Sequence, residues 1–204
     1  NAFRGCRSLR KIIWKEGVRR IGDSCFRGCE RLEGAVLPDS VTEIGEGAFG
    51  DCYRLEAAEL PARLEQIGAG VFERCFSLKT LTLPEKIRTV PRELCAECYG
   101  LEEVTLAEGT EEIRFNAFAD CVHLKKVRNT EHVILAEGTV FQNCVRLDMP
   151  RMDSRCQNGR YLGIDFETLC ENSGQLMLGY EKNHAGELYI SDKLTILHGQ
   201  SDHL

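Results

Sequence analysis

The sequence predicts a mainly β solenoid of stacked 23-residue coils, and two observations carry that prediction. Seven cysteines follow one another at steps of 23 residues without insertion or deletion: Cys6, Cys29, Cys52, Cys75, Cys98, Cys121 and Cys144. Each is followed three positions later by leucine, and each except Cys98 is preceded three positions earlier by phenylalanine. Such self-similarity is typical of repeat architectures, whose coils bury a continuous core only when stacked.

Each unit predicts a short β-strand, a second extended segment and one helical turn, in that order. In the unit that begins at Cys75, Leu81 and Leu83 alternate with polar residues, and Pro84 then prevents further ladder pairing. Ile87 and Val90 indicate the second extended segment on the opposite side. The alanine and phenylalanine before the next cysteine have the spacing of one helical turn. We expect a turn with positive φ at the glycines that follow the second segment, which are Gly22, Gly45 and Gly68.

Composition excludes several functional classes. The chain has 204 residues, 43% of them apolar, and a net charge of −6. This apolar content argues against disorder, and no apolar run approaches the roughly 18 residues that a membrane span needs. An acidic balance gives no electrostatic footprint for nucleic acid. We therefore expect no nucleic-acid partner and no membrane insertion in this chain.

The repeat resembles the BspA-type leucine-rich repeat. Residues 45–52 followed by Leu55 fit that pattern closely, as do residues 60–68, and the resemblance covers residues 1 to about 150. Local departures from the pattern are Cys25, Cys95, Pro91 and Asn129. The resemblance implies a right-handed leucine-rich repeat solenoid, mainly β with short helical turns. It also implies a role like that of bacterial surface proteins, which bind host proteins, matrix or other cells.

Three segments follow from the repeat. Residues 1–150 form the solenoid of about seven coils, which Pro150 ends because it occupies an apolar strand column. Residues 151–185 break the period and are interpreted as an irregular, hairpin-like interruption, and residues 186–204 as a partial repeat that continues the solenoid. The chain begins in mid-repeat without a methionine, so we expect a fragment of a larger repeat protein.

The cysteine ladder permits four interpretations. Cysteines on neighbouring coils lie within disulfide range, but side chains in one file point the same way rather than at each other. Cys95 and Cys98 have zinc-like spacing without a matching second pair. A catalytic thiol needs a nearby histidine, and the five histidines follow no column. The favoured interpretation is a file of buried free thiols, because cysteine is a small, readily buried side chain.

Other catalytic signals are absent from the sequence. It contains no phosphate-binding glycine loop, no HExxH and no G-x-S-x-G. The carboxylate pairs Glu102-Glu103 and Glu111-Glu112 are adjacent in sequence rather than convergent on one pocket, which favours a solvated surface. We therefore predict that the protein is not an enzyme. We also predict that it has no catalytic, metal-binding or cofactor-binding residues and needs no cofactor.

The variable positions of the predicted strand give the candidate binding surface. Residues four, five and seven after each cysteine should face solvent on one sheet. Their charge changes from basic to acidic, then mixed, acidic and basic along the stack. This pattern fits either simple solubilising charge or a mosaic surface for a protein or glycan partner. Trp14 is expected to pack in an end coil, or to be an exposed anchor. The candidate partner-binding residues are Arg10, Lys11, Ile13, Glu33, Val36, Glu56, Glu59, Lys79, Thr82, Glu102, Glu103, Thr105, Lys125, Lys126 and Arg128.

Three functional hypotheses remain open at the sequence level. The first is a non-enzymatic recognition or adhesion module, displayed on a bacterial cell surface or secreted, that binds a protein or glycan. The second is an intracellular leucine-rich repeat scaffold or regulatory protein in the cytoplasm, a compartment that suits free thiols. The third is a repeat region attached to an enzyme domain outside this chain.

Overall fold

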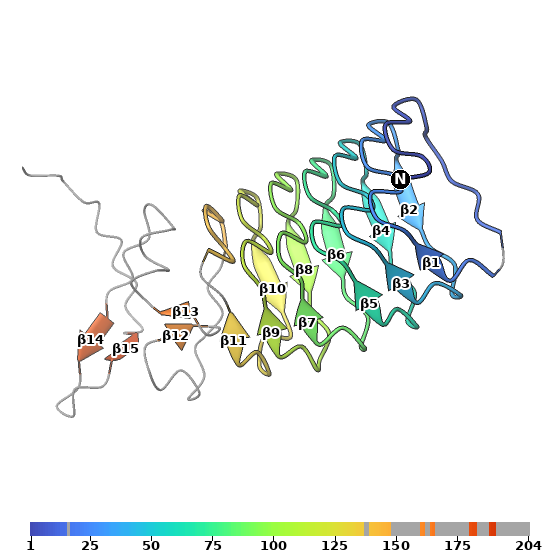
Figure 1. The fold of residues 1–204 in the computed structure, drawn as a ribbon. Helices are drawn as coiled ribbons and strands as arrows, with labels where there is room; N and C mark the ends of the chain where they lie inside the picture. The colour runs from blue at the N-terminus through green and yellow to red at the C-terminus, as the bar shows by residue number, and fades with distance from the viewer. Residues whose placement is uncertain are drawn as a thin grey trace, which may run out of the picture.

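The computed structural model describes residues 1–15, 17–136 and 139–147, together with the backbone of four short strands farther along the chain. The described coils form a mainly β solenoid with two parallel rows of strands (Figure 1). This arrangement confirms the predicted fold class. The three-residue strands lie in one row: β2 (Gly34–Val36), β4 (Ala57–Glu59), β6 (Thr80–Thr82), β8 (Glu103–Thr105) and β10 (Lys126–Arg128). The two-residue strands lie in the other: β1 (Arg20–Ile21), β3 (Glu43–Ile44), β5 (Gln66–Ile67), β7 (Thr89–Val90), β9 (Glu112–Ile113) and β11 (Leu135–Ala136).

The core consists of the columns that the sequence repeat predicts. In the leucine column, Leu32, Leu55, Leu78, Leu101 and Leu124 are each 0% exposed. The phenylalanines of successive coils stack face to face, with ring centroids 5.3 Å apart for Phe26 and Phe49 and 5.9 Å apart for Phe49 and Phe72. Since each coil buries its apolar side only against its neighbours, the core runs the whole length of the described stack.

We call the side of each coil that lies between the two-residue strand and the next core cysteine the turn side. Its backbone is left-handed at positions that the sequence did not predict. Gly22, Gly45 and Gly68 do not have positive φ; instead, a Cβ on Gly68 would lie 2.5 Å from the backbone nitrogen of Glu46. The predicted reason for these glycines is therefore wrong. Gly45 and Gly68 permit close approach to the preceding coil, whereas a Cβ on Gly22 would meet nothing within 4 Å. The left-handed positions stand elsewhere. One precedes each core cysteine, as at Asp51 (φ 58°) and Asp120 (φ 60°).

The segment predicted to form a helical turn makes repeated turns between residues three apart. The Cys29 amide donates to the Phe26 carbonyl at 3.0 Å, and the Gly50 amide donates to the Gly47 carbonyl at 3.0 Å. The described residues contain no helix, and hence none that is long and apolar enough to cross a membrane. Amides on this side also donate to the next coil, as Phe49 does to Val71 at 2.9 Å.

Both strand rows are interrupted at the same place. β2 pairs with β4 and β6 with β8, but β4 and β6 are not paired; likewise β5 and β7 are not paired. At the equivalent positions, the Gly68 amide donates to the Ile44 carbonyl at 2.8 Å and the Arg114 amide to the Val90 carbonyl at 3.0 Å. Pro91 occupies that position at the interruption and has no amide hydrogen to donate. The sequence departure at Pro91 thus coincides with the break.

The first coil departs from the regular stack on its long-strand side. The Glu33 amide donates to the Arg10 carbonyl at 3.1 Å, but residues 11–15 form no strand beside β2. Figure 1 shows this dark-blue segment running out to the edge of the stack before it returns to β1. Trp14 is half-buried and meets the Phe26 ring edge-on at 5.6 Å, which confirms the prediction that it packs in the end coil.

Four further strands form two antiparallel pairs. β12 (Arg160–Tyr161) pairs with β13 (Ile164–Asp165), and β14 (Tyr180–Lys182) pairs with β15 (Leu188–Ile190). The rest of residues 148–204 lies outside the described part of the chain. The predicted interruption at 151–185 and partial repeat at 186–204 therefore remain predictions.

Candidate recognition surface

The row of three-residue strands presents a regular outer face. In each strand the middle residue points into the core and its two neighbours point out; Leu81, Val104 and Val127 are at most 5% exposed. Parallel pairing aligns equivalent residues directly, for example Thr82 with Thr105 and Thr105 with Arg128. The outward side chains therefore form columns along the solenoid, separated by the strand spacing of about 4.8 Å. We call this surface the long-strand face.

All of the predicted candidate residues lie on the surface of this side of the solenoid. Glu102, Glu103 and Thr105 are half-buried, and the others are exposed. The exposed set is Arg10, Lys11, Ile13, Glu33, Val36, Glu56, Glu59, Lys79, Thr82, Lys125, Lys126 and Arg128. Arg10, Lys11 and Ile13 belong to the first coil and are outside the paired strands.

Charges at the two ends of the long-strand face have different environments. Lys125 contacts Glu102 at 2.7 Å and Arg128 pairs with Glu103, so the acidic and basic coils there neutralise one another. Hydrogen bonds from these cations lower the pKa of the Glu102 and Glu103 carboxyls. Among the described residues, the carboxylates of Glu33, Glu56 and Glu59 have no ion-pair partner. The free acidic charge of the face therefore lies in the coils of β2 and β4.

Exposed aliphatic side chains accompany that acidic region. Ile13 is 87% exposed and Val36 is 58% exposed, and both occupy the column seven residues after a core cysteine. Exposed aliphatic side chains beside charge are common at protein interaction sites, whereas isolated ones are ordinary on any surface.

The cysteine file faces backbone carbonyls instead of other sulfurs. The Sγ of Cys52, Cys75 and Cys98 lies 3.3, 3.3 and 3.0 Å from the carbonyl oxygen of Phe26, Phe49 and Phe72, respectively, each time 26 residues earlier. Burial raises the pKa of Cys52 to about 12 and that of Cys144 to about 12. A buried thiol with a raised pKa is a poor nucleophile and a poor metal ligand, because both roles require the thiolate.

The Cys95–Cys98 pair belongs to this core. Cys95 takes the place of a phenylalanine, is 0% exposed, and its carbonyl accepts a hydrogen bond from the Cys121 thiol at 3.1 Å. Burial raises the pKa of both Cys95 and Cys121. In the described part of the chain, no group of three or more histidine, cysteine or acidic side chains is arranged to hold a metal ion.

The adjacent carboxylates do not converge. Glu111 pairs with Arg88 at 2.8 Å, whereas Glu112 pairs with Arg114 at 2.5 Å. Like Glu102 and Glu103, each has its own cation on the surface. An acid–base pair needs two carboxyls directed at one reacting group, and this geometry does not supply one.

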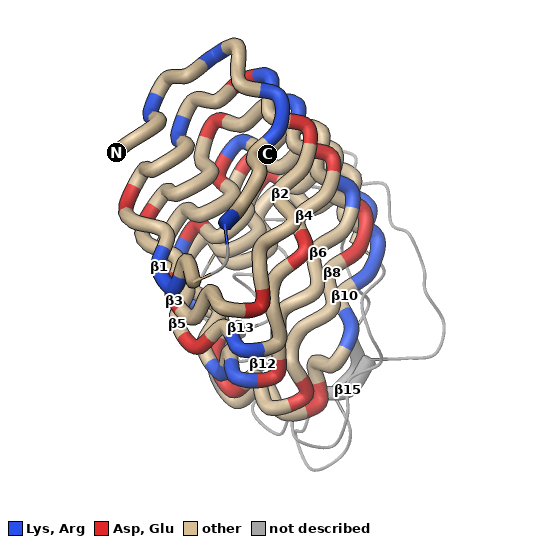
Figure 2. The backbone as a smooth tube through the Cα atoms, turned by 90° about the vertical axis from the view of Figure 1, so that its right-hand side faces the viewer, with Lys and Arg blue, Asp and Glu red and all other residues tan. Residues whose placement is uncertain are grey.

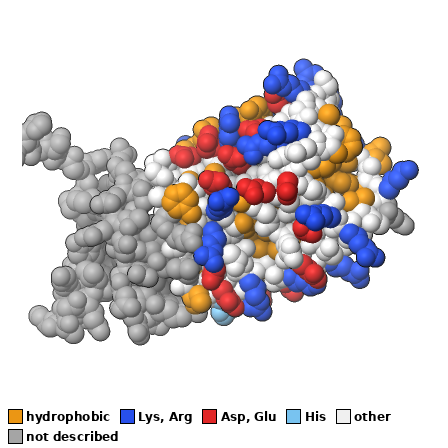
Figure 3. Space-filling model, viewed as in Figure 1, with side chains coloured by type: hydrophobic (Ala, Val, Ile, Leu, Met, Phe, Trp, Pro, Cys, Tyr) orange, Lys and Arg blue, Asp and Glu red, His pale blue; other side chains and the backbone are white. Residues whose placement is uncertain are grey.

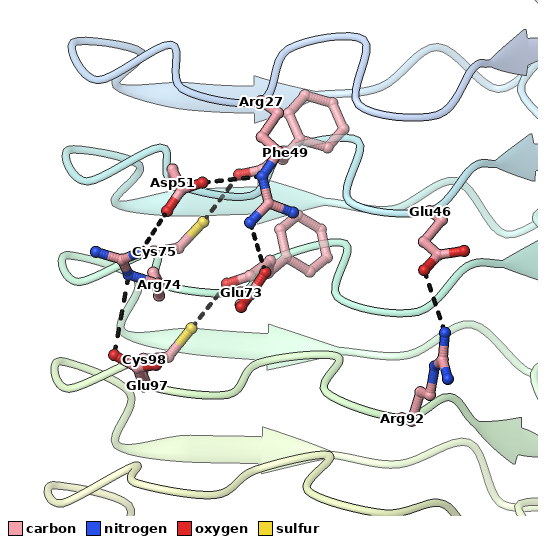
Figure 4. Close-up of polar contacts among 11 residues, drawn as sticks. Arg27, Glu46, Phe49, Asp51, Glu73, Arg74, Cys75, Arg92, Glu97 and Cys98 are labelled. Carbon is pink, nitrogen blue, oxygen red and sulfur yellow. Dashed lines mark hydrogen bonds and ion pairs between the residues drawn. The ribbon is translucent and has the colours of Figure 1, made fainter. Parts of the chain in front are cut away.

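The turn side carries a half-buried ion-pair network that sequence analysis did not identify (Figure 4). Arg27 bonds Asp51 at 2.9 Å and also reaches two coils ahead to Glu73 at 2.8 Å. Arg74 lies 3.3 Å from Asp51 and 3.9 Å from Glu97. Burial by itself lowers the pKa of Arg27, but Glu73 and Asp51 outweigh it and raise the pKa. The network ties four successive coils together rather than forming a site.

The small residue in the intermediate coil makes the two-coil reach possible. A Cβ on Gly50 would lie 3.2 Å from the Arg27 guanidinium. On the same side, Arg92 reaches over the coil of Ala69 to Glu46 at 3.3 Å. The sequence signal is opposite charge 46 residues apart with glycine or alanine midway, which a search of neighbouring repeats overlooks.

A second feature missed from the sequence is a surface ladder of aromatic rings. Tyr53, Phe76 and Tyr99, each directly after a core cysteine, stack with centroids 4.8 and 5.0 Å apart. Arg74 lies over the Tyr53 ring at 5.9 Å. Because the rings stack on one another, they present mainly their edges to solvent, which favours a role in holding coils together.

Comparison with protein families gives a match to the BspA type leucine-rich repeat region in six copies, over residues 1–125 and 88–158. A search of curated proteins gives no match. Among solved structures, a leucine-rich repeat protein from Bacteroides ovatus is 34% identical, with a TM-score of 0.69 over 72% of this chain and 38% of that one.

Two further structures are similar over part of the chain. A leucine-rich cell surface protein from Faecalibacterium prausnitzii is 33% identical, with a TM-score of 0.54 over 56% of this chain and 30% of that one. A leucine-rich repeat protein from Eubacterium ventriosum, 22% identical with a TM-score of 0.56 over 69% of this chain and 45% of that one, shares the fold. The chain thus spans less than half the length of these relatives.

Proposed function

The chain belongs to the BspA-type leucine-rich repeat family, and from that membership we propose that it is a non-enzymatic recognition module that binds a protein or glycan partner. The binding surface is the long-strand face, and the module is one section of a larger repeat protein. The observation that carries this proposal is the alignment of outward side chains into columns on a regular sheet face. Solenoids commonly use such extended faces for interaction.

The proposed location is the bacterial cell surface. The support is the Faecalibacterium prausnitzii relative, which is a leucine-rich cell surface protein. A role in adhesion follows if the partner is a host or matrix component. We further infer that the cysteines of the file remain free thiols, since each described Sγ of the file from Cys29 onward donates to a carbonyl rather than facing another sulfur.

A binding screen with paired variants tests the recognition function. The protein is applied to immobilised purified matrix proteins and glycans, and every ligand bound is then tested with two double variants. Thr80→Arg with Thr82→Arg adds two charges to the long-strand face at β6. Gln66→Arg with Thr89→Arg adds two charges to exposed positions of β5 and β7 on the other strand row.

The expected result is that the β6 variant loses binding and the β5–β7 variant keeps it. Both variants should melt as the parent protein does, since all four positions are exposed. A ligand whose binding is lost equally in both variants, or only in the β5–β7 variant, would place recognition elsewhere on the solenoid. Turnover of a bound glycan or protein by the purified chain would overturn the non-enzymatic proposal.

A further inference from the structure

The first coil has a charge opposite to the rest of the molecule. Residues 1–22 contain seven basic side chains and one acidic one, a net charge of +6, whereas the remaining 182 residues carry −12. The basic side chains are all exposed. We call this set the basic collar: Arg4, Arg7, Arg10, Lys11, Lys15, Arg19 and Arg20.

The collar surrounds the coil instead of lying on one face. Arg10 and Lys11 belong to the long-strand side, Arg20 begins β1 in the other strand row, and Arg4 lies in the turn side. Figure 2, viewed toward the N-terminal end, shows blue segments spaced around the front coil. Figure 3 shows basic side chains at this end of the molecule beside hydrophobic ones, and further basic side chains that lie beside acidic ones along the rest of the face.

Most of these charges are not used inside the molecule. Arg7 contacts Glu30 at 3.0 Å and Arg20 contacts Glu43 at 3.2 Å, but these guanidinium side chains are 77% and 63% exposed and such pairs contribute little. The other five collar residues have no ion pair with any described residue. Farther along, lysine and arginine often pair one coil away, as Lys86 does with Glu65 at 2.6 Å.

Five of the seven collar columns, all except those of Arg4 and Lys15, stay exposed or half-buried in the described coils that have neighbours on both sides. The columns of Arg4 and Lys15 include buried residues, such as Gly50 and Pro61. The column of Arg10 continues as Glu33, Glu56 and Lys79, and the column of Arg19 as Thr42, Glu65 and Arg88; of these only Thr42 is not exposed. Most of the basic charge therefore lies on the outer rim of the coil. It differs in this respect from apolar side chains of the first coil such as Leu9 and Ile12, which pack against the core.

The narrow width of the basic collar determines which class of polyanion can bind to it. The equivalent residues of the next coil, 24–45, carry four acidic side chains and two basic ones, a net charge of −2. Positive potential is therefore confined to a band about one coil, or about 4.8 Å, wide. A planar anionic membrane or a DNA duplex would also cover the acidic coil and be repelled there. A thin flexible polyanion can follow the band alone.

We propose that the basic collar binds a linear acidic polysaccharide, one that carries carboxylate or sulfate groups along a single chain. Five of the seven collar residues are arginines, whose planar guanidinium groups contact such oxyanions through two parallel hydrogen bonds. Trp14 packs inward on Phe26 and is not free to enter a lipid interface, which further favours a polysaccharide over a membrane. Only Arg10 and Lys11 also belong to the candidate residues on the side of the long-strand face. The basic collar is therefore a second binding site, in addition to the proposed recognition surface.

The test compares matched triple variants on heparin and on polygalacturonate, which supply sulfate and carboxylate groups respectively. Arg4→Ser, Lys15→Ser and Arg19→Ser remove three collar charges outside the long-strand face. Arg31→Ser, Arg54→Ser and Arg63→Ser remove three exposed arginines that, among the described residues, make no ion pair. The net charge of the two variants is the same, so only position differs.

The wild-type chain is expected to bind at least one polysaccharide, and the collar variant to bind at least about tenfold more weakly at low salt. The slope of log K against log salt should become shallower by about 2, at about 0.7 per lost contact to a single-chain polyanion. The control variant should bind within about twofold of wild type. Arg4→Lys with Arg19→Lys, which keeps the charge, should retain most of the binding.

Three results would overturn the proposal. One is absence of wild-type binding to both polysaccharides; another is an equal loss in the control variant. The third is equally tight binding to phosphatidylserine vesicles or duplex DNA. Failure of the recognition function is separate, because the β6 variant Thr80→Arg with Thr82→Arg leaves the three collar positions tested here intact.

Discussion

At the scale of single residues, the cysteine file shows how one side chain serves every coil. Its thiol is small enough for the interior and polar enough to donate to the carbonyl of the coil before it, as Cys75 does to Phe49 at 3.3 Å. A buried carbonyl without a donor costs about 1–3 kcal/mol, so this contact explains a cysteine better than an alanine at the position. The sequence predicted the burial but not the acceptor.

Alkylation of the native protein tests both the burial and the redox state of these residues. Iodoacetamide at pH 8 should label Cys6, which is exposed, and leave Cys52, Cys75 and Cys121 unlabelled, because these are 0% exposed and burial raises the pKa of each thiol. Denaturant without reductant should then release every described cysteine for labelling. Intact mass and peptide mapping measure the outcome, and a reduced sample is the control.

A cysteine of the file that stays unlabelled in denaturant until reductant is added is oxidised. A majority of such residues would overturn the inference of free thiols. Rapid native labelling of Cys75 would instead contradict its burial.

At the scale of strands and turns, the junction at Pro91 is where pairing fails. Hydrogen bonds and ion pairs on the turn side still join the coils at this junction. The Phe72 amide donates to the Leu94 carbonyl at 2.9 Å, and Arg92 forms an ion pair with Glu46 across the junction. Pro91 cannot donate a ladder hydrogen bond between β5 and β7, and the pairing of β4 with β6 is interrupted at the same junction. The turn side therefore carries more of the coupling at this junction than at its neighbours.

Hydrogen exchange should detect this local weakness. Amides of residues 86–90, before Pro91, should exchange faster than the equivalent amides of residues 109–113, because fewer ladder bonds protect them. Mass spectrometry of peptides from the native chain measures the two rates directly. Equal protection of the two segments would contradict a weakened junction, and slower exchange at 86–90 would reverse the assignment.

At the scale of the whole molecule, stability is a sum of contacts between adjacent coils. The described coils share one core, so a defect in a central coil separates the stack into two shorter ones. Leu78 is 0% exposed and lies in the coil next to the Pro91 junction. A single change at this position should therefore disturb the coils on both sides.

Leu78→Asp is expected to unfold several coils together. Burying an unpaired carboxylate and losing the leucine contacts should cost at least about 4 kcal/mol, a large part of the stability of a chain this size. Circular dichroism during thermal and urea unfolding measures the loss, and Lys79→Asp, at the exposed next residue, is the control. An unchanged melting curve for Leu78→Asp would refute its place in the core.

The extent of sequence-based prediction follows from the kind of contact involved. The leucine, cysteine and phenylalanine columns were predictable because each position meets its own equivalent in the next coil, so a 23-residue period records the contact directly. The outward strand positions followed from the alternation of strand side chains. Contacts that skip a coil or join different columns, such as Arg27 with Glu73, leave no such period.

The sequence by itself therefore determined the coil, its core and the outward columns of the long-strand face. Only the tertiary structure decided which charges neutralise one another, where the ladder breaks and how far the first coil departs from the stack. It also placed the left-handed residues, such as Asp51 at φ 58°, one position before the core cysteines rather than at Gly45. The physical reason is that these features depend on two or three coils at once, whereas the period is a property of one coil repeated.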